Sequence, residues 1–169
     1  YNKSLLHLSP TIAVINNIDF EHIECYNDID DLKDTFLQFA NSVPFYGTVC
    51  ACKDSNNVAS ILSKIDKPVI TYGIESQNLD IKAENLHQEN GTISFDVKVK
   101  DQIFSVNLSV PGKYNAYNAL AALSVCETMG IDLESACKAL SNFSGVKRRF
   151  DIKANEDIMI IEDYAPHPV

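Results

Sequence analysis

TIAVINNIDFEHIEC, residues 11–25, opens with a short apolar run and continues with polar residues. An apolar run that is rich in β-branched residues, follows a proline and precedes Asn and Asp is typical of a strand buried on both faces. In open parallel sheets, ligands bind in the crevice beyond the carboxyl ends of the strands. We therefore expect a strand at residues 12–15 and a site in the polar segment that follows it.

The next segments alternate between helical and strand patterns. Residues 29–43 and 56–65 carry apolar side chains at three- and four-residue steps, and the second run follows Ser55, a residue suited to an N-cap. Residues 46–52 and 68–72 are short apolar runs between and after them. This alternation predicts an α/β fold, with a mostly parallel sheet flanked by helices and joined by right-handed crossovers.

The pattern changes after residue 78. Residues 79–86, 92–98 and 104–110 alternate apolar with polar side chains, and Asn90-Gly91 separates the first two runs. Asn-Gly between alternating runs is a strong hairpin signal. We expect an antiparallel β meander with one solvated face, appended to the parallel sheet.

Two helices and a short tail complete the chain. Residues 115–129 form an alanine-rich helical pattern, and Asp132 precedes a second one, whose inner stripe we expect to include Leu133 and Phe143. Residues 150–153 and 158–161 predict two more strands, but a tail this short cannot bury its own core. We therefore expect residues 1–146 to be part of one domain and residues 147–169 to be the short β start of a second domain. The strand at residues 12–15 needs a parallel neighbour, so we also expect the chain to begin inside a larger protein.

Composition excludes several classes of protein. The 169 residues are 46% hydrophobic and 22% charged, which suits a globular domain, and the net charge of −9 argues against a nucleic-acid partner. No apolar run approaches the roughly 20 residues of a membrane span, so we expect no membrane insertion. The five cysteines form no C-x-x-C pair and no even framework, which argues against a disulfide scaffold or a zinc site and predicts a cytoplasmic location.

Three groups of polar residues are candidates for chemistry. Asp19, Glu21, His22 and Glu24 would hold a divalent metal or form a solvated loop. Asn115 and Asn118 share a helix face, where their carboxamides suit the edge of adenine, although Asn115 would also serve as a plain N-cap. Near the end of the chain, Arg148 and Arg149 would bind phosphate or pair with the abundant acids nearby, and a polar cluster in which His167 would be structural or catalytic follows: Glu162, Asp163, Tyr164 and His167. Neither G-x-x-x-x-G-K-[ST] nor G-x-G-x-x-G is present.

Several motifs together resemble a known family. SLLHLSP, TIAVINNIDFEH, SVPFYG, PGKYNAYNALAA, GVKRRF and EDYAPHP follow in the order and spacing of the Mur ligases, over essentially all 169 residues. The NID-x-x-H and PFYG segments favour the members that join L-alanine to UDP-N-acetylmuramate in peptidoglycan precursor synthesis. A murein-peptide-recycling member of the family and a non-catalytic nucleotide- or metal-binding module stay open as alternatives.

The resemblance implies an ATP-dependent ligase that works through an acyl phosphate. Residues 1–146 would be most of the central ATPase domain, with the phosphate loop and an acidic metal ligand upstream of Tyr1, so this chain alone is expected to be inactive. His22 matches the family's metal-binding histidine, for Mg²⁺ with Mn²⁺ as the alternative. Asn115 and Asn118 match its adenine contacts.

The resemblance also assigns residues near the end of the chain. Arg149 and Asp163 match nucleotide contacts made from the C-terminal domain, and Tyr164 and His167 fall in the segment that faces the incoming amino acid. The family usually has two consecutive histidines before the proline, whereas this chain has Pro166-His167. That difference leaves the specificity for alanine open.

Overall fold

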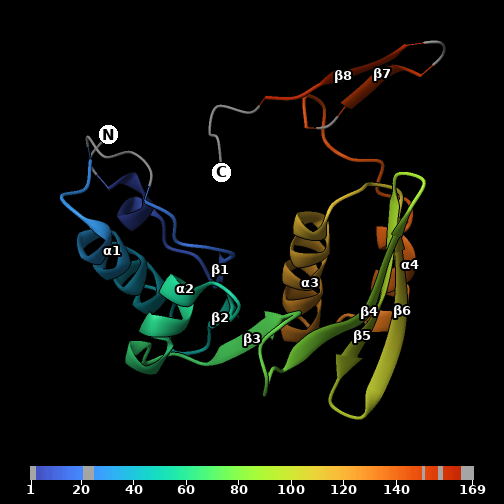
Figure 1. Ribbon diagram of the computed structural model, residues 1–169. Helices are drawn as coiled ribbons and strands as arrows, with labels where there is room; N and C mark the ends of the chain where they lie inside the picture. Colours follow the sequence, from blue (N-terminus) through green and yellow to red (C-terminus); the bar gives the residue numbers. More distant parts are fainter. Residues whose placement is uncertain (1–2, 21–24, 150, 156–157, 165–169) are drawn as a thin grey trace.

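The computed structural model describes residues 3–20, 25–149, 151–155 and 158–164 (Figure 1). The elements follow in the order η1 (Ser4–His7), β1 (Ile12–Ile15), α1 (Ile29–Asn41), β2 (Thr48–Cys52), α2 (Asn56–Ile61), η2 (Leu62–Lys64), β3 (Val69–Gly73), β4 (Ile81–Glu89), β5 (Thr92–Val99), β6 (Gln102–Leu108), α3 (Lys113–Thr128), α4 (Leu133–Leu140), β7 (Asp151–Asn155) and β8 (Met159–Glu162). Strands β1 to β6 form one sheet in sequence order, and β7 and β8 form a second sheet. The predicted α/β fold is confirmed.

The first half of the sheet is parallel, and helices cover both faces. β1 pairs with β2 and β2 with β3 in parallel, with α1 and α2 as crossovers. Successive residues of β2 point to opposite faces. Val49 and Ala51 therefore belong to the apolar cluster under α1 and α2, while Cys50 and Cys52 belong to the cluster under α3 and α4. The cysteines are small buried core residues, and all five in the chain are free thiols.

β1 differs from its prediction. Ala13 and Ile15 are buried under α1, but Val14 on the opposite face is 40% exposed. α3 packs against β2 and β3, and among the described strands β1 lies at the edge of the sheet. The prediction that β1 is buried on both faces is therefore wrong for the residues described, because an apolar run does not reveal which of its faces is covered.

The meander joins the parallel half through a short stretch of pairing. β4 begins parallel to β3, with Tyr72 opposite Ile81, and then pairs antiparallel with β5. Glu89 lies opposite Thr92, so Asn90 and Gly91 make a two-residue turn, and both have positive φ. The hairpin prediction is confirmed.

α4 lies against β6, and the carboxylate of its N-cap residue, Asp132, accepts from the N–H of Ser135 at 2.8 Å. Leu133 and Cys137 form its buried stripe. Phe143 follows the end of the helix and is 41% exposed, so its predicted inner position is wrong.

The tail folds back on itself as β7 and β8, which pair antiparallel. The apolar side chains of Met159 and Ile160 in β8 are more than half exposed. Among the described residues, no helix has the length and hydropathy that a membrane span requires.

Candidate functional site

The carboxyl ends of β1, β2 and β3 meet at one edge of the sheet, and each is followed by polar groups. Asn16 follows β1, Asp54 lies two residues beyond β2, and Glu75 and Ser76 lie two and three residues beyond β3. The first turns of α3 reach the same edge, because Asn118 contacts Asn16 and Tyr117 contacts Asp54. This is the edge at which the sequence predicts a site, and it carries two separate polar clusters.

The first cluster, which we call the amide chain, consists of Tyr72, Asn16, Asn118, Asn115 and the carbonyl of Pro111. The buried Tyr72 hydroxyl donates to Asn16 Oδ1. Asn16 Nδ2 donates to Asn118 Oδ1 at 3.1 Å, and Asn118 Nδ2 donates to Asn115 Oδ1 at 3.5 Å. Asn115 Nδ2 then donates to Pro111 O at 2.7 Å. All four hydrogen bonds run in one direction.

The amide chain leaves hydrogen-bonding capacity unused. A carboxamide has two N–H donors and two acceptor lone pairs. In the bonds described here, the amide of each of Asn16, Asn118 and Asn115 uses one donor and one lone pair. Asn16 and Asn118 are exposed and Asn115 is half-buried. These amides can therefore offer a donor and an acceptor side by side to a planar polar ligand such as a nucleobase.

The structure excludes one of the two interpretations of Asn115. Gly112, with φ 98°, is the N-cap residue of α3, and Asn115 is the third residue of the helix. The side chain of Asn115 turns back to Pro111 O, so the plain N-cap interpretation is wrong. Asn115 and Asn118 lie together on one face of the helix, as the sequence predicts.

The second cluster, which we call the aspartate cluster, is built around the Asp54 carboxylate. Asp54 Oδ2 accepts from the N–H groups of Ile74 at 2.6 Å and Glu75 at 2.9 Å, and Oδ1 accepts from the N–H of Ser76 at 2.8 Å. The Tyr117 hydroxyl donates to Oδ2 at 2.9 Å. One carboxylate thus ties the end of β2 to the loop after β3 and to α3.

Four donors strongly favour the ionised form of Asp54. Partial burial raises the pKa of this carboxyl, but the hydrogen bonds from Glu75, Ile74 and Ser76 outweigh burial and hold the pKa well below its ordinary range. Burial, and then the hydrogen bond to Asp54, raise the pKa of Tyr117. Gly73 is required here by space, because a Cβ at this position would lie 2.7 Å from Asp54 Oδ1.

The loop after β1 contains the predicted metal cluster, of which only Asp19 lies within the described residues. Asp19 is exposed and accepts from Asn17 Nδ2 at 2.7 Å, while Asn57 Nδ2 holds the carbonyl of Ile18 at 2.7 Å. Glu21, His22 and Glu24 lie outside the described residues. Within the part of the chain that is described, no group of three His, Cys, Asp or Glu side chains is placed to hold a metal ion.

The predicted residues near the end of the chain gather at the base of the β7–β8 hairpin. Arg149 Nη1 donates to the carbonyl of Tyr164 at 3.2 Å, and the N–H of Tyr164 donates to Arg148 O at 2.7 Å. Arg148 lies over the Tyr164 ring, and its Nε lies 3.5 Å from Glu162 Oε1. Arg148 thus forms the ion pair with a nearby acid that the sequence offers as one alternative. Asp163 is exposed next to Tyr164, and His167 lies outside the described residues.

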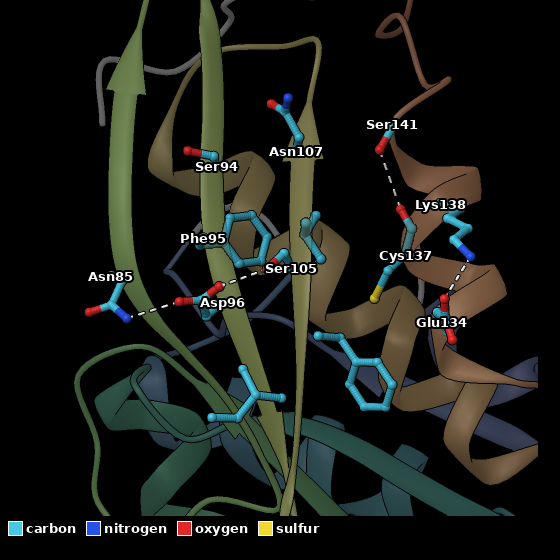
Figure 2. A pocket seen from close by; sticks show the side chains of 13 residues that line it. Asn85, Ser94, Phe95, Asp96, Ser105, Asn107, Glu134, Cys137, Lys138 and Ser141 are labelled. Atoms are coloured by element: carbon cyan, nitrogen blue, oxygen red, sulfur yellow. Dashed lines mark hydrogen bonds and ion pairs between the residues drawn. The ribbon is translucent and has the colours of Figure 1, made fainter.

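A cleft of about 660 Å³ lies elsewhere, between the meander and α4 (Figure 2). Its polar groups bind one another, because Asp96 accepts from Asn85 at 2.9 Å and from Ser105 at 3.0 Å, and Lys138 pairs with Glu134 at 2.6 Å. It contains none of the residues that the sequence singles out, and we assign it no function.

Sequence analysis did not identify Asn16, Tyr72, Asp54 or Tyr117 as site residues. For two of them the sequence does contain a signal. Asn16 directly follows β1 and Asp54 lies two residues after β2, at the carboxyl ends of parallel strands, where ligands usually bind. Tyr72 lies inside a strand and Tyr117 inside a helix, where the sequence pattern marks neither as a site residue.

Comparison with known proteins agrees with this architecture. A family model described as the Mur ligase middle domain matches residues 2–126. UDP-N-acetylmuramate--L-alanine ligase from Sulfurihydrogenibium sp. (strain YO3AOP1) is 47% identical over 165 residues, which are 98% of this chain and 36% of that protein. The enzyme of the same name from Persephonella marina is 45% identical over 98% of this chain and 35% of its own length. The chain thus spans about a third of these relatives.

Solved structures share the fold. MurF from Acinetobacter baumannii superposes with a TM-score of 0.83 at 19% identity, over 95% of this chain and 35% of that chain. UDP-N-acetylmuramate-alanine ligase from Thermotoga maritima gives a TM-score of 0.81 at 24% identity, over 99% of this chain and 37% of that chain. With a middle-domain family model that matches most of its length and a six-stranded sheet of the same architecture, the chain belongs to the Mur ligase family.

Proposed function

We propose that the protein to which this chain belongs joins L-alanine to UDP-N-acetylmuramate at the expense of ATP, in the cytoplasm. The observation that carries the proposal is the 47% identity, over 98% of the chain, with a curated ligase that bears this name. The carboxylate of the muramate would attack the γ-phosphate of ATP and release ADP. The amine of alanine would then displace phosphate from the acyl phosphate, so that an amide forms.

Within this proposal, Asn115 and Asn118 bind the adenine of ATP. Their amides lie on one helix face at the carboxyl edge of the sheet and keep free donor and acceptor positions. Adenine offers an exocyclic amine beside a ring nitrogen, which is the complement of a carboxamide. A structural neighbour, MurF from Thermotoga maritima, was solved in complex with ADP, which supports nucleotide binding by this fold.

The remaining assignments rest on the sequence resemblance. We propose His22, which lies outside the described residues, as a ligand of Mg²⁺. Arg149 and Asp163 would contact the nucleotide, and Tyr164 and His167 would face the amino acid.

We also propose a domain boundary between residues 146 and 147. The tail forms a sheet separate from the six-stranded one, which supports this boundary. The exposed Met159 and Ile160 would pack within the rest of the second domain.

A second candidate is the recycling of murein peptides. Murein peptide ligase from Psychrobacter arcticus has a TM-score of 0.75 and 27% identity with this chain. Eight curated relatives at 38% to 47% identity are all named as alanine ligases, which favours the first candidate.

The test is an assay of the full-length protein with UDP-N-acetylmuramate, ATP and Mg²⁺. We expect phosphate release that depends on free L-alanine and does not occur with an L-alanyl tripeptide in its place. Dependence on the tripeptide would establish the recycling function instead. Nucleotide binding without phosphate release under either condition would identify a non-catalytic module.

Asn118→Ala tests the adenine site in the same protein. We expect its affinity for ATP to fall about tenfold, since one amide contact to the base is lost. Asn107→Ala is a matched control, because Asn107 is an exposed amide on β6, which lies at the other end of the strand order from β1, and it is not part of the amide chain. Equal affinities for the two variants would remove Asn118 from the site.

A further inference from the structure

The direction of the amide chain is set at its buried end. A phenol has a single proton to donate, and two acceptors lie near the Tyr72 hydroxyl. The carbonyl of Ile15 is 3.5 Å away, whereas Asn16 Oδ1 is much closer and receives the proton. Tyr72, on β3, is fully buried in the apolar cluster under α3 and α4, so its hydroxyl has no competing access to solvent. Asn16 therefore keeps its oxygen toward Tyr72 and its NH₂ group toward α3.

Through the hydrogen bonds of the amide chain, the orientation of Asn16 also determines the orientation of Asn118 and Asn115, the proposed base contacts. Because Asn16 presents a donor, Asn118 must present its oxygen to Asn16 and its NH₂ group to Asn115. The carbonyl of Pro111 accepts at the far end, which fixes the NH₂ group of Asn115 as well. A carboxamide that is free in water presents either face at equal cost, but here each amide has one favoured orientation.

An amide of fixed orientation distinguishes bases that differ in one group. Adenine carries an exocyclic amine, a donor, beside the acceptor N1, whereas hypoxanthine carries a carbonyl oxygen, an acceptor, beside a protonated N1. Turning the amide by 180° exchanges its preference between these two edges. A site that holds the amide in one orientation thus leaves polar groups unpaired against the wrong base, which is an effective way to reject it.

We propose that Tyr72 and Asn16 are positioning residues that set the selectivity of this protein for adenine over 6-oxopurine nucleotides, by fixing the orientation of Asn118 and Asn115. The proposal rests on the proposed ATP site. Neither residue needs to touch the base, because both act through the hydrogen bonds of the amide chain.

The experiment compares the Kd values of ATP and ITP for the full-length protein, by competition against one fluorescent nucleotide. ITP differs from ATP only at the edge in question. The Kd of ITP divided by the Kd of ATP reports base selectivity. A change in overall folding or in phosphate binding affects both Kd values and cancels from this ratio. For the unaltered protein we expect ITP to bind at least tenfold more weakly than ATP.

Two variants change the amide chain at its buried end, at Tyr72 and Asn16. Tyr72→Phe keeps the ring in the core but removes the proton that orients Asn16, and we expect the ratio to fall about fivefold. Asn16→Asp goes further, because a carboxylate only accepts and Asn118 must turn its NH₂ group toward it. We expect this variant to lose the preference for ATP or to prefer ITP.

Matched controls separate orientation from side effects. Tyr46→Phe removes an exposed hydroxyl at the opposite, amino end of β2, and Asn17→Asp adds the same charge one residue away, on a side chain that bonds Asp19 instead. Both controls should keep the ratio of the unaltered protein. Unchanged ratios in Tyr72→Phe and Asn16→Asp, when Asn118→Ala does weaken ATP binding, would overturn this inference alone. If Asn118→Ala binds both nucleotides as the unaltered protein does, the proposed adenine site falls and this inference falls with it.

Discussion

The two polar clusters at the carboxyl edge of the sheet are neighbours on α3, yet they differ in how completely their hydrogen bonds are used. Asp54 receives four donors, three from backbone and one from Tyr117. Asn118 of the amide chain directly follows Tyr117 on α3, and the chain keeps unused donors and acceptors at the exposed Asn16 and Asn118. A saturated cluster stabilises the fold, whereas an unsaturated one is available to a ligand. The difference predicts opposite responses to substitution.

The largest effect on stability is expected for Asp54→Ala. The change leaves the N–H groups of Ile74, Glu75 and Ser76 without their acceptor, and we expect a loss of about 3 kcal/mol in the free energy of unfolding. Urea unfolding measures it. Asp34→Ala is the matched control, since Asp34 is an exposed acid on α1, and its effect should stay within about 0.5 kcal/mol. Equal stabilities of the two variants would show that the hydrogen bonds of the aspartate cluster do not stabilise the fold.

The same contribution should depend on pH in the acid range. The pKa of Asp54 is lowered in the folded protein, so its stabilisation is present above the unfolded pKa of about 3.9 and is lost as the pH falls toward the folded value. We expect the difference in stability between the unaltered protein and Asp54→Asn to be constant between pH 6 and 8 and to shrink below about pH 4. Urea midpoints across this range test it, and a difference that does not change with pH would contradict ionisation as its source.

Gly73→Ala should have an intermediate effect on stability, through the same carboxylate. The new Cβ would lie 2.7 Å from Asp54 Oδ1, and the side chain can move away only by giving up hydrogen bonds. We expect a loss of about 2 kcal/mol. In the Asp54→Ala background, Gly73→Ala should lower the free energy of unfolding much less, because the carboxylate atoms that obstruct the new Cβ are absent. Additive losses in the double variant would mean that Gly73 is needed for another reason.

The smallest effect on stability is expected for Asn118→Ala. Its amide is exposed and its contact to Asn115 is long, at 3.5 Å, so the free energy of unfolding should change by less than about 0.5 kcal/mol. Thermal or urea unfolding of the variant used for the ATP-binding test checks this directly. A loss as large as that of Asp54→Ala would mean that the amide chain is also structural, and the contrast between the clusters would disappear.

Local pattern was enough to predict most elements of this fold. Asn90-Gly91 permits the two-residue turn with positive φ, and the carboxylates of Asp28 and Asp132 accept from N–H groups in the first turns of α1 and α4. These signals act over a few residues, so the sequence contains them completely. The errors at Val14 and Phe143 have the opposite origin, because they concern which face another element covers.

The candidate site was predictable only in part. Asn115 and Asn118 stand three residues apart on a helix, so their common face follows from helical geometry. The bonds that orient them join residues far apart in the chain, since Tyr72 and Asn16 are 56 positions apart and Asn16 and Asn118 are 102 positions apart. No local pattern specifies such pairs.

The sequence by itself determined the family, because its motifs follow in the family's order. It also determined the alternation of strands and helices and the edge of the sheet where the polar groups collect, because periodicity and turn chemistry are local. Only the tertiary structure decided that Tyr72 bonds to Asn16 and that Tyr117 bonds to Asp54, 63 residues apart in the chain. The physical reason is that parallel crossovers bring the ends of distant strands to one edge, where hydrogen bonds depend on distance in space and not on separation in sequence.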